Sequence, residues 1–224
     1  MVNDTRVTDG MHQADKSYGR FITLEGIEGS GKSTLLPYIR TFLETAGKSV
    51  VVTREPGGTP LGEELRRLLL DPSYDSLAPS AELLMIFAAR VEHLEKVIKP
   101  SLRQGRWIVC DRFTDATYVY QGEGRNIATA RIDALVDWVQ GAMRPDLTLI
   151  FDVPVPMGLS RVRQRGEKDR FEREEQRFFE RVRNAYLMLA AEHPDRCQVV
   201  DASAPLDVVR LRVDSILRAF LHDS

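Results

Sequence analysis

One glycine-rich run near the start of the chain has the residue types needed to bind phosphate. Gly26–Ser33 reads GIEGSGKS, which fits the pattern G-x-x-x-x-G-K-[ST] of phosphate-binding loops. In such a loop, glycines let successive backbone N–H groups point at phosphate oxygens, and the following helix adds the partial positive charge of its N-terminus. We expect Lys32 to reach the β and γ phosphates of a nucleotide and Ser33 to ligate Mg²⁺.

Charged side chains also follow two later apolar runs. Asp111 and Arg112 come directly after Trp107–Cys110, and Arg54 follows Ser49–Thr53. The carboxyl ends of strands form the ligand crevice of open α/β sheets. We therefore expect Asp111 to hold Mg²⁺ or its waters, and Arg54 and Arg112 to bind a second phosphate group. A surface ion pair is the alternative role for either arginine.

Two more segments have the composition of a substrate site. Phe87 and Arg90, in the run FAAR, lie three residues apart and hence on one helix face, where they would stack on a base and bond its edge. Because Phe87 stands among aliphatic residues, a core position is its alternative. The segment Asp115–Arg125 combines hydroxyls, tyrosines, an amide and glycines, which predicts a substrate-facing loop or short helix.

An arginine-rich stretch lies late in the chain. Arg161–Arg173 reads RVRQRGEKDRFER and is interrupted by Gly166. We predict a mobile lid over residues 161–173, because an arginine delivered by a closing lid stabilises charge on a transferred phosphoryl group. A solvated charged helix, with the acidic residues of the same run as ion-pair partners, is the alternative.

The elements that must position these segments alternate along the chain. Short apolar runs predict strands at Phe21–Glu25, Ser49–Thr53, Trp107–Cys110, Leu147–Asp152 and Gln198–Asp201. Segments of helical period predict helices at Lys32–Ala46, Leu61–Leu70, Ser80–Gln104, Ala128–Ala142, Glu175–His193 and Pro205–His222. The alternation indicates an α/β fold around a parallel sheet. Pro37 and Pro100 fall inside predicted helices, where each predicts a kink.

Composition and charge set limits on the class of protein. The chain has 224 residues, 43% of them hydrophobic, and a formal net charge of −2. This balance argues against a nucleic-acid or membrane-surface partner, and no apolar run approaches the roughly 18 residues of a membrane span. We predict a disordered tail over residues 1–18 and a single domain over residues 19–224.

The cysteines indicate a reducing compartment. Cys110 and Cys197 lie in separate apolar runs, IVC and CQVV, that we interpret as neighbouring core strands. Two buried thiols are typical of such positions, so we expect a cytoplasmic protein.

Together these motifs resemble the bacterial type of the thymidylate kinase family. The resemblance runs from Phe21 to the C-terminal helix and rests on EGIEGSGKS, TREPGGTPLGE, FAAR, the DR of CDRF, YQGEGR, RPDLTLIFDV and RGEKDRFE. It implies a P-loop NTPase fold, a three-layer sandwich with a five-stranded parallel sheet flanked by helices. It further implies a homodimeric enzyme of dTTP biosynthesis that phosphorylates dTMP to dTDP using ATP and Mg²⁺.

The resemblance also assigns residues to each role. For ATP it implies Gly26, Ile27, Glu28, Gly29, Ser30, Gly31, Lys32, Ser33 and Thr34. For dTMP it implies Arg54, Glu55, Pro56, Phe87, Arg90, Arg112, Thr117, Tyr120 and Gln121. The implied metal ligands are Ser33 and Asp111. The implied catalytic residues are Lys32, Glu28, Asp111, Arg112 and a lid arginine, with Arg165 preferred over Arg161 and Arg163.

Several of these residues carry a specific expectation from the resemblance. Phe87 would stack on thymine, Arg90 would bond the pyrimidine edge, and Tyr120 would crowd the 2′ position and so favour deoxyribose. Glu28 would lie near the 3′-hydroxyl of the acceptor sugar. Since the variable loop position is Glu28 and the lid is rich in arginine, the chain resembles the family type whose catalytic arginine lies in the lid.

The loop at residues 116–125 departs from the usual family pattern. Ala116 removes a hydroxyl, Val119 adds bulk, and Glu123 adds negative charge. We expect these changes to alter affinity more than chemistry.

Two other functions remain open from sequence. One is a kinase for a different nucleoside monophosphate, such as dUMP, CMP or dGMP, on the same scaffold. The other is a P-loop ATPase that acts as a switch or binding protein without an acceptor.

Overall fold

The computed structural model of the chain describes residues 18–74, 77–164, 169–172 and 174–222. Its strands are β1 (Phe21–Glu25), β2 (Val50–Arg54), β3 (Trp107–Asp111), β4 (Leu147–Asp152) and β5 (Cys197–Asp201). Its α-helices are α1 (Lys32–Thr45), α2 (Pro60–Leu70), α3 (Pro79–His93), α4 (Lys99–Arg103), α5 (Thr114–Thr117), α6 (Thr129–Val139), α7 (Val155–Arg163), α8 (Gln176–Glu192) and α9 (Leu206–His222). Two π-helical segments complete it, η1 (Leu94–Ile98) and η2 (Tyr118–Gly124).

The described strands form one parallel sheet in the order β2-β3-β1-β4-β5. Every neighbouring pair is parallel, with β1 between β3 and β4. The prediction of a five-stranded parallel sheet flanked by helices is therefore confirmed. The interpretation of Cys110 and Cys197 as residues of neighbouring strands was wrong, because β1 and β4 separate β3 from β5. Both thiols are buried and free.

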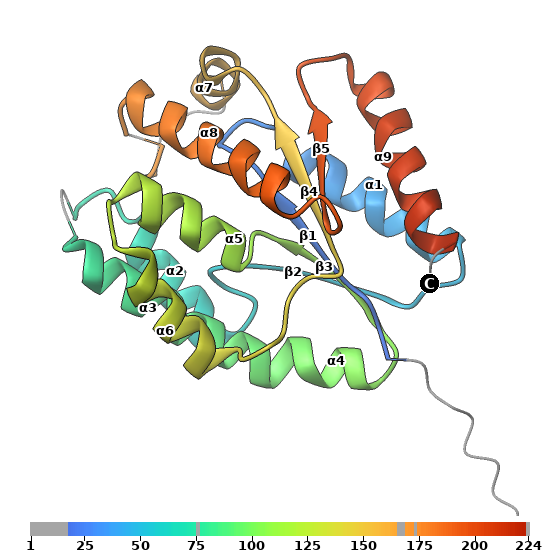
Figure 1. Ribbon diagram of the computed structural model, residues 1–224, viewed down its shortest axis with the longest axis horizontal. Coiled ribbons are helices and arrows are strands. Elements are labelled where there is room, and N and C mark those ends of the chain that lie inside the picture. Colours follow the sequence, from blue (N-terminus) through green and yellow to red (C-terminus); the bar gives the residue numbers. More distant parts are fainter. Residues whose placement is uncertain (1–17, 75–76, 165–168, 173, 223–224) are drawn as a thin grey trace, which may run out of the picture.

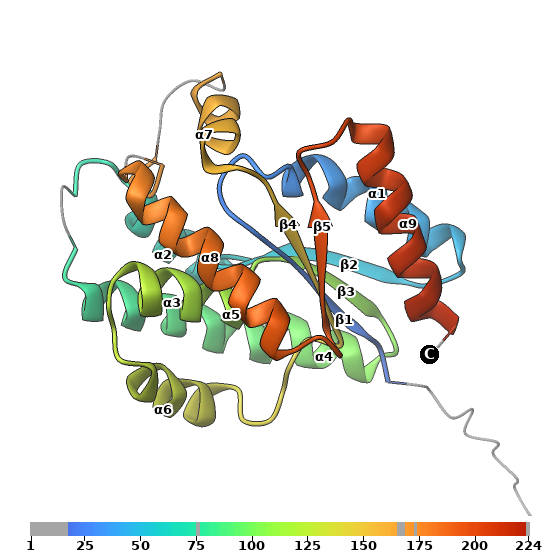
Figure 2. The same ribbon diagram turned by 45° about the horizontal axis from the view of Figure 1, so that its top comes forward.

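Helices cover both faces of the sheet (Figure 1). Alternate residues of β1 point to opposite sides: Ile22 and Leu24 pack with α1 and α9, whereas Phe21 packs with η1 and α4. On the second face, α8 and η2 cover the part of the sheet near Ile150. The layers seen in Figure 2 place α1 and α9 on one side and α3, α5 and α8 on the other. The inner strands β1, β3 and β4 are therefore buried on both faces, whereas the edge strands β2 and β5 are partly exposed.

The carboxyl ends of the strands lead into the segments singled out in the sequence. β1 leads into the glycine-rich loop at residues 26–31, β2 into Glu55–Gly58, and β3 into Arg112 and α5. These three segments lie side by side at one edge of the sheet, because β3 lies between β2 and β1. None of the helices in the described ranges has the length and apolarity that crossing a bilayer requires.

Candidate active site

The glycine-rich loop closes around the side chain of Lys32. The Lys32 Nζ donates to the carbonyl oxygens of Gly26 (2.8 Å) and Ile27 (3.0 Å) and to Ser30 Oγ (3.2 Å). Burial, followed by the nearby charge of Arg112, lowers the pKa of Lys32 to about 8. The ammonium group is thus held at the centre of the loop, where phosphate oxygens would stabilise its charge.

The loop is packed tightly against α7, and Gly29 makes this possible. A Cβ atom on Gly29 would lie 2.1 Å from the carbonyl oxygen of Gly158 in α7, and its φ of 73° also disfavours a side chain. The backbone of α7 therefore supports the loop from outside.

Two clefts lie on either side of this loop. The first, of about 340 Å³, is lined by residues that follow β2 and β3 and by α3 and η2. The second, of about 370 Å³, is lined by Thr34, Leu35, Arg161, Ala202 and Val209, among others. Gly29, Ser30, Gly31 and Ser33 line both. We call the first the acceptor cleft and the second the donor cleft, after the roles expected from sequence for residues that line them, and the glycine-rich loop separates the two.

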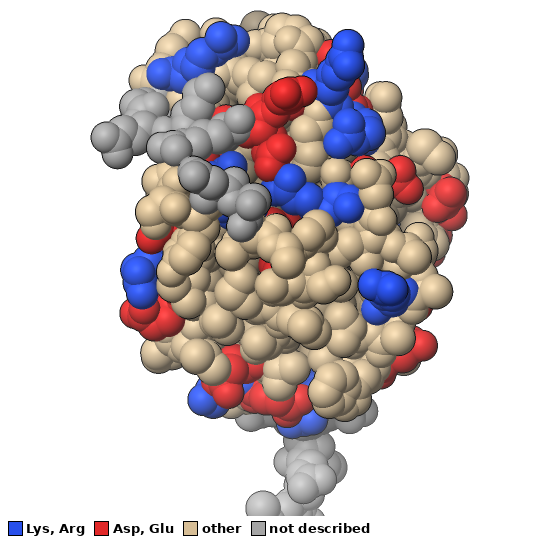
Figure 3. All heavy atoms as spheres, turned by 90° about the vertical axis from the view of Figure 1, so that its left-hand side faces the viewer, with Lys and Arg blue, Asp and Glu red and all other residues tan. Residues whose placement is uncertain are grey.

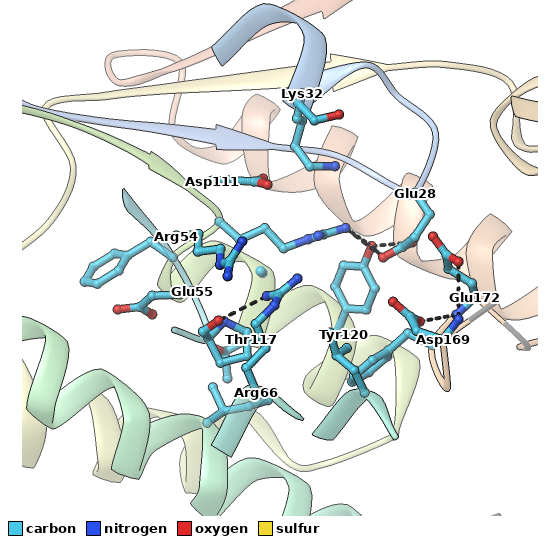
Figure 4. Close-up of a pocket in the computed structure, with 18 of the residues that line it drawn as sticks. Glu28, Lys32, Arg54, Glu55, Arg66, Asp111, Thr117, Tyr120, Asp169 and Glu172 are labelled. Carbon is cyan, nitrogen blue, oxygen red and sulfur yellow. Dashed lines mark hydrogen bonds and ion pairs between the residues drawn. The ribbon is translucent and has the colours of Figure 1, made fainter. Parts of the chain in front are cut away.

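The acceptor cleft gathers cationic side chains. Four arginines line it together with Lys32, namely Arg54, Arg66, Arg90 and Arg112. In Figure 4, Lys32 and Asp111 lie at the top of the cleft, Thr117 and Arg66 toward the bottom, and Glu28, Tyr120 and Asp169 on the right. This concentration of positive charge in a chain of net charge −2 is suited to binding anionic groups.

Arg112 occupies a strained turn directly after β3. Its φ is 66°, in the left-handed region that side chains other than glycine seldom adopt. The backbone N–H donates to the Leu24 carbonyl (3.0 Å), and Nη2 donates to Glu28 Oε1 (2.7 Å) and to the Tyr120 hydroxyl (3.0 Å). The turn aims the guanidinium along the cleft toward the glycine-rich loop, where Glu28 and Tyr120 hold it.

Asp111 offers an oxygen without a protein partner. Its Oδ1 is buried and makes no hydrogen bond within the described residues, although the side chain lines the acceptor cleft. Ser33, at the start of α1, lines the same cleft. A carboxylate and a hydroxyl are ligands that Mg²⁺ prefers, so these residues fit the ion.

The far end of the acceptor cleft is built around Arg90, a fully buried side chain of α3. Its Nε donates to Glu55 Oε2 (2.7 Å) and its Nη2 to Thr117 Oγ1 (2.9 Å). The guanidinium carbon lies 4.8 Å from the centre of the Phe87 ring and 5.1 Å from that of Phe113. Of these two rings, Phe113 lines the cleft, whereas the buried Phe87 is absent from its lining.

A second buried carboxylate, Glu82, joins the acceptor cleft to the lid region. Glu82 accepts hydrogen bonds from Gln121 Nε2 (2.8 Å), Arg125 Nε (3.3 Å) and Arg170 Nη2 (2.6 Å). Arg170 also donates from Nε to the Leu69 carbonyl (2.8 Å). The described lid segment at residues 169–172 is thereby fastened to the ends of α2 and α3, and it lines the cleft.

The lid arginines occupy different places. Arg161 donates from Nη1 to the carbonyls of Gly29 and Ala202 (both 3.3 Å) and lines the donor cleft. Arg163 is exposed and donates to the Leu159 carbonyl (3.3 Å). Arg165, preferred from the sequence, lies outside the described residues, as does Gly166.

Comparison with known proteins identifies the family of this chain. A family model described as thymidylate kinase matches residues 24–213 of the chain. The chain belongs to the thymidylate kinase family. The thymidylate kinase of Alkalilimnicola ehrlichii is 56% identical over 200 residues, covering 89% of this chain and 92% of that protein. The thymidylate kinase of Pseudomonas putida (strain W619) is 54% identical over 202 residues, with 90% and 98% covered.

A solved structure agrees with these sequence relatives. The crystal structure of the thymidylate kinase from Ehrlichia chaffeensis matches with a TM-score of 0.73 at 36% sequence identity, covering 89% of this chain and 99% of that one. The P-loop NTPase fold and the thymidylate kinase resemblance predicted from sequence are thus confirmed.

The structure gathers most of the residues that sequence assigned to this thymidylate kinase site. Those that line the acceptor cleft are Glu28, Gly29, Ser30, Gly31, Lys32, Ser33, Arg54, Glu55, Pro56, Arg90, Asp111, Arg112, Thr117, Tyr120 and Gln121, whereas Gly26 and Ile27 line neither cleft. Phe87 is the assigned acceptor residue that does not line the acceptor cleft. Thr34 lines the donor cleft. Sequence reasoning missed Arg66, which lines the cleft, and Glu82, which pairs with Arg170 of the predicted lid. Arg66 stands in a charged helical run that is typical of a solvated surface.

Proposed function

We propose that this thymidylate kinase family member transfers the γ-phosphoryl group of ATP to the 5′-phosphate of dTMP, giving dTDP and ADP. The arrangement that supports this reaction is a phosphate-binding loop shared by two clefts. A donor and an acceptor bound on either side of one loop bring their phosphates together, and phosphoryl transfer depends mainly on such positioning and on electrostatic stabilisation. A P-loop ATPase without an acceptor would not need the second cleft.

On the donor side, the loop amides and Lys32 would bind the ATP phosphates, while Arg161 and Ala202 lie where the rest of the nucleotide would be bound. Ser33 and Asp111 would hold Mg²⁺, which when bound neutralises charge on the phosphates. The buried, unpartnered Asp111 Oδ1 supports that assignment.

On the acceptor side, Arg54, Arg66 and Arg112 would bind the dTMP phosphate. Arg54 is already paired with Glu63 at 2.7 Å, which leaves the guanidinium oriented but half exposed. Arg112 is held by Glu28 and Tyr120, so its position is fixed before substrate arrives.

At the base end, Arg90, Thr117 and Gln121 would recognise the pyrimidine edge, with Tyr120 beside the deoxyribose. Arg90 lines the cleft, and its buried Nη1 has no partner within the described residues, which supports a role for it as the donor to a base. Stacking of Phe87 on thymine stays a prediction, since that ring now packs behind Arg90.

We infer a single domain whose lid, including residues 169–172, closes over the acceptor. Asp169, Phe171 and Glu172 line the cleft from this segment. A lid arginine would stabilise charge on the transferred group, with Arg165 preferred and Arg161 or Arg163 as alternatives. Water exclusion by the same lid would suppress hydrolysis of ATP.

We also infer a cytoplasmic homodimer without nucleic-acid or membrane partners. Figure 3 shows a broad surface of uncharged residues on the side where α2, α3 and α6 lie in Figure 1. Leu84 and Val91, two turns apart on α3, are 57% and 41% exposed, and Trp138 on the adjacent α6 is 83% exposed. A second copy of the chain would cover such an apolar surface.

The test is ADP release with ATP and Mg²⁺ against dTMP, dUMP, UMP, CMP, AMP and dGMP. We expect fast turnover with dTMP and little with the other nucleotides. An Arg165→Ala variant should lose about 10³-fold in kcat if that arginine acts on the transferred group. Stimulation by another monophosphate instead of dTMP would assign a different acceptor, and no stimulation by any would contradict the kinase proposal.

A further inference from the structure

A chain of buried hydrogen bonds runs from β2 to the acceptor cleft. The Thr53 hydroxyl lies 2.6 Å from His93 Nε2, and His93 Nδ1 lies 2.9 Å from Glu55 Oε1. The second oxygen of Glu55 accepts from Arg90, which in turn donates to Thr117. His93, Glu55 and Arg90 are each at most 3% exposed, so water does not supply alternative partners.

Chemistry fixes the direction of the hydrogen bonds in this chain. A carboxylate accepts hydrogen bonds and does not donate them, so Nδ1 of His93 must carry the proton shared with Glu55. In the neutral imidazole, Nε2 then has a lone pair and accepts from the Thr53 hydroxyl. Glu55 thereby selects the tautomer with the proton on Nδ1, and the Thr53 hydroxyl, which can donate or accept, pairs with Nε2.

Glu55 stays ionised despite its burial because of these partners. Burial alone would raise its pKa, but the charge of Arg90 and the hydrogen bond from His93 outweigh burial and lower it. If the His93 donor were removed, Oε1 would be a buried carboxylate oxygen without its partner, which is costly. The carboxylate would then rotate or shift, and Arg90 would lose its fixed position.

The backbone around Glu55 is shaped to fit the imidazole. A Cβ atom on Gly58 would lie 2.6 Å from His93 Nε2 and 2.6 Å from Thr53 Oγ1. Gly58 also has a φ of 76°. The loop after β2 therefore closes over His93 at a position that only glycine fits.

Arg90 lines the acceptor cleft and ends the chain with one donor that has no partner among the described residues. Two of its three nitrogens are committed, Nε to Glu55 and Nη2 to Thr117, and the buried Nη1 has no partner among the described residues. A guanidinium is a rigid planar group, so fixing two nitrogens fixes the third. The orientation of Nη1 is consequently determined by Glu55, whose own orientation depends on His93.

We propose that His93 is a positioning residue for recognition of the acceptor base: its Nδ1–H fixes Glu55, which aims Arg90 into the acceptor cleft. This proposal rests on the proposed function, because Arg90 must meet a dTMP base. It does not place His93 in contact with substrate. A simple packing role is the competing explanation for a buried histidine, and it makes a different prediction about substitutions.

Two substitutions separate the nitrogens of the ring. The amide of asparagine has a nitrogen where Nδ1 stands in histidine, so His93→Asn keeps the donor to Glu55 and loses the contact with Thr53. The amide of glutamine reaches the position of Nε2, so His93→Gln keeps a partner for Thr53 and leaves Glu55 Oε1 without its donor. We expect His93→Gln to raise KM for dTMP about tenfold or more, with KM for ATP unchanged.

Rescue by asparagine is the decisive observation. His93→Asn should have a KM for dTMP within about threefold of the wild-type value, since it keeps the charged hydrogen bond. A packing role would instead favour glutamine, the larger side chain, and would lower thermal stability without separating the two KM values. Equal KM values for dTMP in both variants would overturn the proposal. Wild-type turnover with dTMP is the reference, and its absence would contradict the proposed function instead.

A measurement on the wild-type protein covers the case in which the variants do not fold. Nitrogen-15 NMR of histidine-labelled protein reports which ring nitrogen carries hydrogen. His93 is the buried histidine of the described residues, whereas His193 and His222 are exposed. We expect a slowly exchanging proton on Nδ1 of His93. The opposite tautomer, with the proton on Nε2, would overturn the proposal.

Discussion

Glu25, the last residue of β1, is a buried carboxyl group whose hydrogen bonds connect three parts of the structure. Its Oε1 accepts from the Phe113 backbone N–H (2.8 Å) and its Oε2 lies 2.7 Å from the Tyr186 hydroxyl. Burial, with a smaller effect of Asp115, raises the pKa of Glu25 to about 8. Glu25 thus links β1, the strained turn at Arg112 and α8 while remaining mainly protonated at neutral pH.

This raised pKa predicts a specific dependence of stability on pH. Between the ordinary pKa of 4.5 and about 8, the folded chain binds a proton at Glu25 that the unfolded chain releases. The contribution is therefore full below the unfolded value and is lost as pH rises through that window, at about 1.4 kcal/mol per pH unit. Glu25→Gln, which keeps the shape and hydrogen bonds without ionising, should remove this slope.

The measurement is the free energy of unfolding in urea at several pH values between 5 and 8. The difference between wild type and Glu25→Gln should change steadily with pH in favour of the variant. Glu180→Gln, on the exposed face of α8, provides a matched control with no such trend. A pH-independent difference between Glu25→Gln and wild type would contradict the raised pKa.

Lys32 leads to a second pH prediction, this time for ligand binding. Its pKa of about 8 lies below the ordinary value of 10.5, so the free protein loses this charge at mildly alkaline pH. Above pH 8, ATP affinity should fall by up to about tenfold per pH unit, because binding requires the charged form. Titration calorimetry between pH 7 and 9.5 measures this fall. Lys32→Met should bind ATP weakly and with a flat profile, and a flat wild-type profile would contradict the prediction.

At the scale of elements, the strands were predicted well from sequence and one helix was missed. β1 and β4 have the predicted bounds, and the ends of the other strands differ by at most one residue. α7 was not predicted, because Pro154 and Pro156 interrupt its sequence. In the structure Pro154 is the residue before α7 and Pro156 lies in its first turn, where a missing N–H costs no hydrogen bond.

The prolines inside predicted helices had unequal effects. α1 continues across Pro37 as one helix, and the kink predicted there stays a prediction. The predicted helix at Ser80–Gln104 instead divides into α3, η1 and α4. Lys99 bonds back to the Leu94 carbonyl, a wider π-type turn just before Pro100. Such a wide turn accommodates Pro100, which has no backbone N–H to donate and whose ring crowds the preceding turn of the helix.

The part of the site that sequence could not reveal consists of pairs far apart in the chain. The P-loop, Asp111 and Arg112 were recognisable because motif and strand end coincide. Glu82 and Arg170 are 88 residues apart. Glu82 is an acidic residue in the first turn of an otherwise apolar helix segment, and Arg170 lies in a charged run, so neither position by itself predicts burial. Only the fold shows that they meet in a buried ion pair.

This ion pair predicts how firmly the lid segment is held. Arg170→Met keeps the side-chain length but removes the bonds to Glu82 and to the Leu69 carbonyl. Breaking one partner of a buried charge pair is strongly destabilising locally, so amide exchange at residues 169–172 should become faster. KM for dTMP should rise about tenfold, and ATP hydrolysis without dTMP should increase.

Hydrogen exchange with mass spectrometry and a coupled assay measure these effects. Arg177→Met, at an exposed position of α8, is the control and should change neither. Unchanged exchange at residues 169–172 in Arg170→Met would show that the ion pair does not hold the segment.

At the scale of the whole molecule, the fold explains how a chain with a slightly negative net charge can have a strongly positive cleft. The chain carries a formal net charge of −2, yet four arginines and Lys32 line one cleft. The carboxyl ends of β1, β2 and β3 bring these cations together, whereas the remaining surface balances them. We therefore expect local binding of nucleotide phosphates without general affinity for polyanions.

The uncharged surface over α3 and α6 is the surface that we predict to form the dimer interface. Leu83 and Phe87 of α3 pack against Ile132 and Val136 of α6, so the two helices present one continuous outer face. In a two-fold dimer each substitution on that face occurs twice, and Trp138→Glu would place two carboxylates in an apolar interface. The dimer dissociation constant should rise about 100-fold or more.

Light scattering coupled to size-exclusion chromatography at micromolar concentration measures this change. Wild type should elute as a dimer and Trp138→Glu as a monomer. Leu211→Glu, which changes a 69% exposed apolar residue on α9, is the matched control and should remain dimeric. Dissociation by Leu211→Glu but not by Trp138→Glu would move the interface to the opposite side of the sheet. Because α3 also carries Arg90 and His93, a dimer formed through α3 would join the stability of the acceptor cleft to assembly.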